Sequence, residues 1–339
     1  MQVKPRLSPQ TYAQGILSGD RIVLGQAITL IESSLASDQD LAASLLELIL
    51  PHTGRSIRIG ITGVPGVGKS TFIEAFGQHV LQQHKRLAVL TIDPSSQLTR
   101  GSILGDKTRM ETLSKTPGAF IRPSAAGQAL GGVAHKTREA LLLCEAAGYD
   151  VILIETVGVG QSEVAVKSMV DFFLLLALAG AGDELQGIKK GILEMADAIV
   201  VTKADGDNLK RATEAQTDYQ LALHLSSPAE SGWRPAVMTA SAHMGIGIDA
   251  VWETVMTFYD QMTASGMLNT ARSAQQVAWF KDHFQYLISS DIDRSGALRD
   301  LSKILEHDVQ ASKLSAPIAA KKLMEAYRQH FIRPSAAAN

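Results

Sequence analysis

The residues with the clearest chemical purpose form a glycine-rich run, GVPGVGKS at positions 63–70. It fits the pattern G-x-x-x-x-G-K-[ST], and it lies between a predicted strand and a helix-compatible run. Glycines let several backbone N–H groups point at one phosphate, and the helix N-terminus adds partial positive charge. Lys69 would then bridge the β- and γ-phosphates, and the Ser70 hydroxyl would ligate Mg²⁺. The predicted members of this phosphate loop are Gly63, Val64, Pro65, Gly66, Val67, Gly68, Lys69, Ser70 and Thr71.

A second run, TKAD at 202–205, indicates which base is bound. Asp205 would accept hydrogen bonds from guanine N1–H and the 2-amino group, and Lys203 would cover the base plane with its stem. Two such charge-assisted bonds, at roughly 1.5–3 kcal/mol each, would discriminate against adenine. Thr202 stands where many GTPases have Asn, whose amide can reach both the base and the phosphate loop. The predicted nucleotide is GTP or GDP, with further backbone contacts to guanine O6 from Ser241, Ala242 and His243.

Two acids end predicted strands on the same side of the domain. Asp93 follows the strand candidate 87–92, and Glu155 ends the candidate 151–155, where the sequence continues as ETVG. This run resembles the Asp-x-x-Gly that senses the γ-phosphate through Mg²⁺, with Glu in place of Asp. The carboxyl ends of parallel strands are where α/β sheets bind ligands, although either acid alone could be a solvated strand end. Val159, rather than glutamine, follows the motif, so we expect slow hydrolysis without a partner.

The elements that must position these residues alternate between strand and helix over some 200 residues from position 56. Most strand candidates are apolar at consecutive positions, as expected for strands that are covered on both faces. The alternation predicts an α/β fold: a P-loop GTPase domain with a doubly wound, mostly parallel sheet. The strand candidates are 57–62, 87–92, 119–121, 151–155, 172–177, 199–202 and 236–239.

Helical patterns flank this domain on both sides. The N-terminal part carries apolar stripes at 3–4 spacing, and Ser37, with two acids behind it, resembles a helix N-cap. The C-terminal part carries three such stripes, which must pack on their own domain or form a dimer. The predicted division is a helical extension at 1–55, the GTPase domain at 56–262 and a second helical extension at 263–339.

Composition excludes several classes of function. Among 339 residues the net charge is −2, so no basic field draws the protein to nucleic acid or an anionic membrane. The most apolar run, 172–182, is shorter than the roughly 20 residues of a membrane span, and no signal peptide is recognisable. Cys144 is the only cysteine, which excludes a disulfide framework within the chain. We expect a soluble, cytoplasmic protein.

Three further runs carry a family resemblance: DPSSQLTRGSILGDKTRM at 93–110, ETVGVGQSE at 155–163 and GAGDELQGIKKG at 180–191. They closely resemble the bacterial MeaB/ArgK P-loop GTPases, relatives of the methylmalonic aciduria type A protein. The resemblance covers roughly residues 10–330. It implies a chaperone of adenosylcobalamin-dependent methylmalonyl-CoA mutase that gates cofactor loading and protects or reactivates the mutase. It also implies a homodimer held largely by the C-terminal extension.

The same resemblance implies roles for single residues. Segments 95–109 and 157–163 match the first and second switches, and 180–191 matches a third mobile loop. Lys189 or Arg109 would supply charge to the transition state when a partner orders its loop. The implied metal ligands are Ser70, Asp93, Asp106 and Glu155, and the implied catalytic residues are Lys69, Arg109, Glu155, Asp183 and Lys189.

Three other functions stay open at this point. A nickel or cobalt metallochaperone GTPase would need a His/Cys cluster, and the nine histidines are scattered. A small-molecule kinase using ATP is opposed by Asp205 and the following Ser-Ala segment. A GTPase of the same branch could instead serve a different acyl-CoA mutase.

Overall fold

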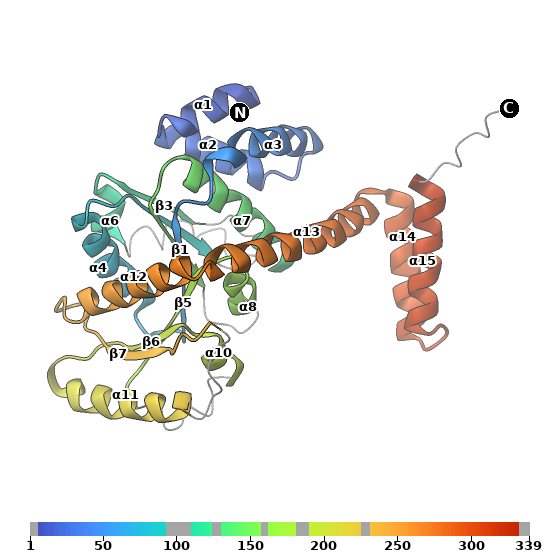
Figure 1. Ribbon diagram of the computed structural model, residues 1–339. Coiled ribbons are helices and arrows are strands. Elements are labelled where there is room, and N and C mark those ends of the chain that lie inside the picture. The colour runs from blue at the N-terminus through green and yellow to red at the C-terminus, as the bar shows by residue number, and fades with distance from the viewer. Residues whose placement is uncertain are drawn as a thin grey trace. The chain divides into compact units, whose positions relative to one another are not determined.

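The computed structural model describes residues 6–92, 110–123, 130–156, 162–180, 190–224 and 231–331. Its centre is a seven-stranded sheet in the order β3-β2-β4-β1-β5-β6-β7, and all the described neighbouring strands are parallel (Figure 1). The predicted α/β class is therefore confirmed. The strands are β1 (Ile57–Gly63), β2 (Leu87–Ile92), β3 (Ala119–Pro123), β4 (Val151–Thr156), β5 (Phe172–Ala177), β6 (Ala198–Val201) and β7 (Ala236–Thr239).

Helices cover both faces of the sheet, which explains the continuous apolar runs. One core cluster joins the sheet to α4 (Lys69–Gln82), α6 (Glu111–Lys115) and α12 (Ile248–Ala264). A second cluster packs β5, β6 and β7 against α11 (Leu209–His224). The remaining helices around the sheet are α7 (Leu130–Ala146), α8 (Ser162–Lys167) and α10 (Lys190–Met195).

The N-terminal helices form a small bundle, and all three α-helices of it contact α7. The predicted N-cap at Ser37 is wrong: the third helix begins at Ala36 and its N-cap is Leu35, without a side-chain cap bond. Asp38 instead pairs with Arg6 through two hydrogen bonds of 3.2 and 2.7 Å. The bundle consists of α1 (Pro9–Leu17), α2 (Arg21–Glu32), α3 (Ala36–Ile49) and the 3₁₀ turn η1 (Leu50–His52).

The chain divides by packing into two compact units, 1–275 and 276–339. The long helix α13 (Met267–Arg294) begins in the first unit and continues in the second, where α14 (Gly296–Gln310) packs with α15 (Ala316–Phe331). The three-part division predicted at 55 and 262 stays a prediction. None of the described helices combines the length and apolar character that a membrane span needs.

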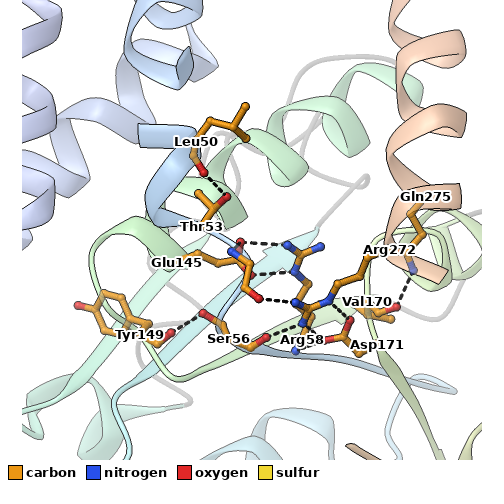
Figure 2. A network of polar contacts seen from close by, with 11 residues as sticks. Leu50, Thr53, Ser56, Arg58, Glu145, Tyr149, Val170, Asp171, Arg272 and Gln275 are labelled. Carbon is orange, nitrogen blue, oxygen red and sulfur yellow. Dashed lines mark hydrogen bonds and ion pairs between the residues drawn. The ribbon is translucent and has the colours of Figure 1, made fainter. Parts of the chain in front are cut away.

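A buried polar network lies at the amino ends of β1 and β5 (Figure 2). Arg58 of β1 forms two 2.9 Å hydrogen bonds with Glu145 of α7. Arg272, in the first turns of α13, donates to both carboxylate oxygens of Asp171 at 2.8 and 2.6 Å. The same guanidinium also donates to the carbonyls of Gly54 and Ser56. The network therefore joins segments from four parts of the sequence at the amino ends of the central strands, away from the phosphate loop.

Candidate functional site

The phosphate loop connects the end of β1 to the first residue of α4. Gly63 ends the strand, and a Cβ there would meet the Leu176 carbonyl oxygen at 2.6 Å. Gly68 is the N-cap of α4 with φ of 95°, a left-handed conformation that disfavours a side chain. Both glycines are therefore required by the local backbone. Of the following residues, Ser70 is half-buried in the first turn and Thr71 is exposed.

Lys69 is the cation of this loop. Its Nζ donates to the carbonyls of Gly63 at 2.7 Å and Val64 at 3.2 Å. Burial lowers the pKa of Lys69 below the ordinary lysine value, while the negative charges of Glu155 and Glu163 act in the opposite direction. The ammonium group thus binds carbonyls of its own loop, and the charges of Glu155 and Glu163 act on it.

The two acids come from different elements. Glu155, on β4, is in register with Ile61 of β1, and residues in register on parallel strands share a face of the sheet. Ile61 lies in the core cluster beneath α4, so Glu155 faces the helix that carries Lys69 and Ser70. Glu163 belongs to α8 and is 1% exposed. The sequence prediction omitted Glu163 from the site, and its only signal was its acidic type at the end of the run 155–163.

The base loop, defined as residues 202–208, lies against the phosphate loop. Lys203 Nζ donates to the Gly66 carbonyl at 2.9 Å, and its Cε lies 3.9 Å from where a Cβ on Gly68 would stand. Asp205 accepts a hydrogen bond from the Ser241 hydroxyl, which in turn accepts the Met244 N–H at 3.2 Å. The structure therefore brings together Lys203, Asp205 and Ser241, with half-buried Ala242 and exposed His243 beside Ser241 in the chain.

Thr202 replaces the amide of the usual Asn with a hydroxyl, and this hydroxyl reaches the phosphate loop. Its Oγ1 lies 2.7 Å from the Val67 carbonyl oxygen and 3.2 Å from that of Ala177. Sequence reasoning treated this position only as a departure from the usual pattern. The link to the phosphate loop is present in the structure.

Part of the predicted site lies outside the described residues. Of the predicted metal ligands, Ser70 and Glu155 are described, and their hydroxyl and carboxylate oxygens are the hard donors that suit Mg²⁺. In the described part of the chain, no group of three or more His, Cys, Asp or Glu side chains could hold a metal. The predicted residues that fall outside the described ranges are Asp93, Asp106, Arg109, Asp183 and Lys189.

Comparison with known proteins identifies the family of this chain. The model of the family described as "Methylmalonyl Co-A mutase-associated GTPase MeaB" matches residues 24–295. The GTPase ArgK of Escherichia coli strain K12 is 49% identical over 78% of this chain and 80% of its own. The mouse protein named "Methylmalonic aciduria type A homolog, mitochondrial" is 45% identical over 93% of this chain and 78% of its own.

A solved structure is similar over nearly the whole chain. The crystal structure of a protein described as an LAO/AO transport system kinase superposes with a TM-score of 0.75. It is 36% identical and covers 96% of this chain and 100% of that one. The family match, the two relatives and this fold agree with the phosphate and base loops described above. The chain belongs to the MeaB family of GTPases.

Proposed function

We propose that this GTPase binds GTP and Mg²⁺ at the phosphate and base loops and is a chaperone of adenosylcobalamin-dependent methylmalonyl-CoA mutase. In this role it would gate loading of the cofactor and protect or reactivate the mutase. The nucleotide part rests above all on one contact, the 2.9 Å hydrogen bond from Lys203 to the phosphate loop. This contact joins the base-reading residues to the phosphate cradle.

Each side chain then has a distinct task. Lys69 exchanges the carbonyls of its own loop for the β- and γ-phosphates, where its charge is better compensated. Asp205, held by Ser241, accepts from the guanine edge. Ser70 and Glu155 would hold Mg²⁺, with Asp93 and Asp106 as further proposed ligands. The metal would neutralise phosphate charge when it is bound. Arg109, Asp183 and Lys189 stay proposed catalytic residues.

Guanine selection by Asp205 gives the first prediction. GTP and GDP should bind at least about tenfold tighter than ATP and ADP, because guanine alone offers two donors to this carboxylate. Asp205→Asn should shift the preference towards xanthine nucleotides, since an amide can donate to the 2-oxo group that a carboxylate repels. Equilibrium binding of fluorescent nucleotide diphosphates would measure both effects.

Asp207→Asn is the matched control, because Asp207 is an exposed residue of the same loop. It should leave the base preference unchanged. Equal affinity of the unmodified protein for GDP and ADP would contradict the assignment of Asp205.

The mutase is proposed as the partner because the family description names an association with it. The apolar stripe of α13 supports the further proposal of a homodimer, since Val277, Phe280, Phe284 and Leu287 are 45–71% exposed in the single chain. A second copy covering this stripe would remove it from water.

The second prediction tests the partner. Saturating methylmalonyl-CoA mutase should accelerate GTP hydrolysis at least about tenfold, which corresponds to ~1.4 kcal/mol of barrier. The reason is that a site without glutamine after the ETVG motif depends on another protein to complete it. Steady-state phosphate release against mutase concentration measures the effect, and bovine serum albumin serves as the control protein. Absence of stimulation, together with no complex in gel filtration in any nucleotide state, would exclude the mutase.

A further inference from the structure

Thr91 is the only polar residue of β2, and its hydroxyl is buried without a partner. The strand reads LAVLTI, and Thr91 is 4% exposed. Within the described part of the chain, its Oγ1 is shielded from water and has no hydrogen-bond partner. An unsatisfied buried hydroxyl destabilises a fold, and a valine would fill nearly the same space without this cost. The cost indicates that the hydroxyl is kept for a task other than packing.

Glu155 lies beside Thr91 on the neighbouring strand. The two residues are register partners on β2 and β4, and neighbouring strands lie about 4.8 Å apart. An earlier pair in the same register, Val89 and Leu153, is buried in the core cluster beneath α4. Because side chains alternate between the two faces of a sheet, Thr91 and Glu155 both point to that face. The hydroxyl is therefore within reach of the Glu155 carboxylate.

Ser70 lies over the same part of this face. Gly77 of α4 packs on the start of β2, since a Cβ on Gly77 would lie 2.8 Å from Leu87 Cδ2. The helix returns from the end of β1 towards the start of a parallel strand, so it runs against β2. Ser70 is on the same side of α4 as Gly77, about 10 Å nearer its N-terminus. Thr91 lies about 13 Å beyond Leu87 along the strand, which places it below the end of α4 that carries Ser70.

We propose that Thr91 is a positioning residue for the metal site, whose hydroxyl donates to the Glu155 carboxylate and holds it for Mg²⁺. A carboxylate has two oxygens, so one can bind the cation while the other accepts the hydroxyl proton. Metal-ligating carboxylates are commonly hydrogen-bonded in this way, and loss of such a bond weakens metal binding about 10- to 100-fold. The proposal rests on the proposed function of Ser70 and Glu155 as Mg²⁺ ligands, and it adds a residue that does not itself touch the metal.

Two substitutions of Thr91 separate the hydroxyl from the shape of the side chain. Thr91→Val removes the hydroxyl at nearly constant volume, and Thr91→Ser keeps it. The dissociation constant of Mn²⁺, a paramagnetic substitute for Mg²⁺, is measured by electron paramagnetic resonance on the GDP complex of each variant. Thr91→Val should raise this constant at least about tenfold, and Thr91→Ser should stay within about threefold of the unmodified protein. In EDTA all these proteins should bind GDP equally, because the hydroxyl acts only on a metal ligand.

A double variant tests whether Thr91 acts through Glu155. Once Glu155→Gln has removed the carboxylate, the further change Thr91→Val should alter the Mn²⁺ dissociation constant by less than about twofold. Thr254→Val is the matched control, because the Thr254 hydroxyl donates to a carbonyl of its own helix, that of Ala250, at 2.8 Å. It should leave Mn²⁺ binding unchanged.

Thermal melting without metal or nucleotide distinguishes positioning from packing. Thr91→Val should melt at the same temperature as the unmodified protein or higher, because it removes an unsatisfied buried hydroxyl. A lower melting temperature with unchanged Mn²⁺ affinity would make Thr91 a packing residue and overturn the proposal.

Two further outcomes would also contradict a role through Glu155. Additive losses in the double variant would mean that Thr91 acts on another group, such as Glu74, whose Oε2 is likewise buried without a hydrogen-bond partner among the described residues. An unmodified protein that binds GDP but no Mn²⁺ would remove the metal site on which the proposal rests. Failure to bind GDP at all would instead refute the proposed function.

Discussion

Replacement of Lys69 by alanine should lower the affinity for GTP and GDP by at least about 100-fold, or ~2.7 kcal/mol. Lys69 is the cation that the phosphate loop presents, and charge-assisted hydrogen bonds of this kind contribute roughly 1.5–3 kcal/mol each. In the structure its ammonium donates to two loop carbonyls, at 2.7 and 3.2 Å. It is therefore already placed where the phosphates would enter. Titration with a fluorescent GDP analogue measures the loss.

Two further variants show what part of the lysine matters. Lys69→Met keeps most of the stem and removes the charge, so it should lose nearly as much affinity as Lys69→Ala. Lys115→Ala is the control. Lys115 is an exposed lysine of α6, where it pairs with Glu111 at 2.5 Å, and its removal should leave nucleotide affinity unchanged. A loss of less than about tenfold in a folded Lys69→Ala protein would mean that the phosphates lie elsewhere.

The phosphate loop could be predicted from the sequence because its determinants are local. Glycines at 63, 66 and 68 with Lys69 and Ser70 lie within eight consecutive residues, and the strand and helix around them have clear apolar patterns. The structure has a strand ending at Gly63 and a helix beginning at Lys69. The bounds of β2, β5 and β7 are as predicted, and those of the other strands differ by one or two residues, since hydrogen bonding rather than apolar character ends a strand.

Other parts of the site depend on contacts that no sequence spacing reveals. Glu163 is brought near Lys69 by the packing of α8 on the sheet, and a buried acid cannot be recognised from its neighbours in the chain. From the sequence, Thr202 indicates only the loss of an amide, whereas its hydroxyl reaches a carbonyl 135 residues away in sequence. At Ser37 the local capping pattern was overridden, because the helix already begins at Ala36 and Asp38 pairs with Arg6.

The polar network of Figure 2 could not be predicted from the sequence either, because its members are far apart in the sequence. Arg272 and Gly54 are separated by 218 positions, and Arg272 and Asp171 by 101. The helical pattern of the C-terminal part gave no reason to expect a buried cation at Arg272. In the structure this arginine connects the first turns of α13 to the amino ends of β1 and β5 through its hydrogen bonds.

Arg272→Ala should lower the free energy of unfolding of the unit 1–275 by about 3–5 kcal/mol, the range for removing one partner of a buried ion pair. The side chains of Arg272 and Asp171 are 12% and 1% exposed, so water cannot replace the lost donors at the carboxylate. The carbonyls of Gly54 and Ser56 lose their donors as well. Urea denaturation followed by tryptophan fluorescence measures the change.

Asp171→Asn is the complementary variant. It keeps an oxygen that can accept the backbone N–H of Arg58, now bonded to Asp171 at 2.9 Å, but it removes the negative charge that compensates Arg272. The double variant should cost less than the sum of the two single changes, because both remove the same ion pair. Arg211→Ala, at an exposed arginine of α11, is the control and should stay within about 0.5 kcal/mol of the unmodified protein.

The network lies at the opposite end of β1 from Gly63, so GDP affinity of the folded Arg272→Ala protein should be unchanged. Additive losses in the double variant would show that Arg272 and Asp171 act independently and would refute this account of the network.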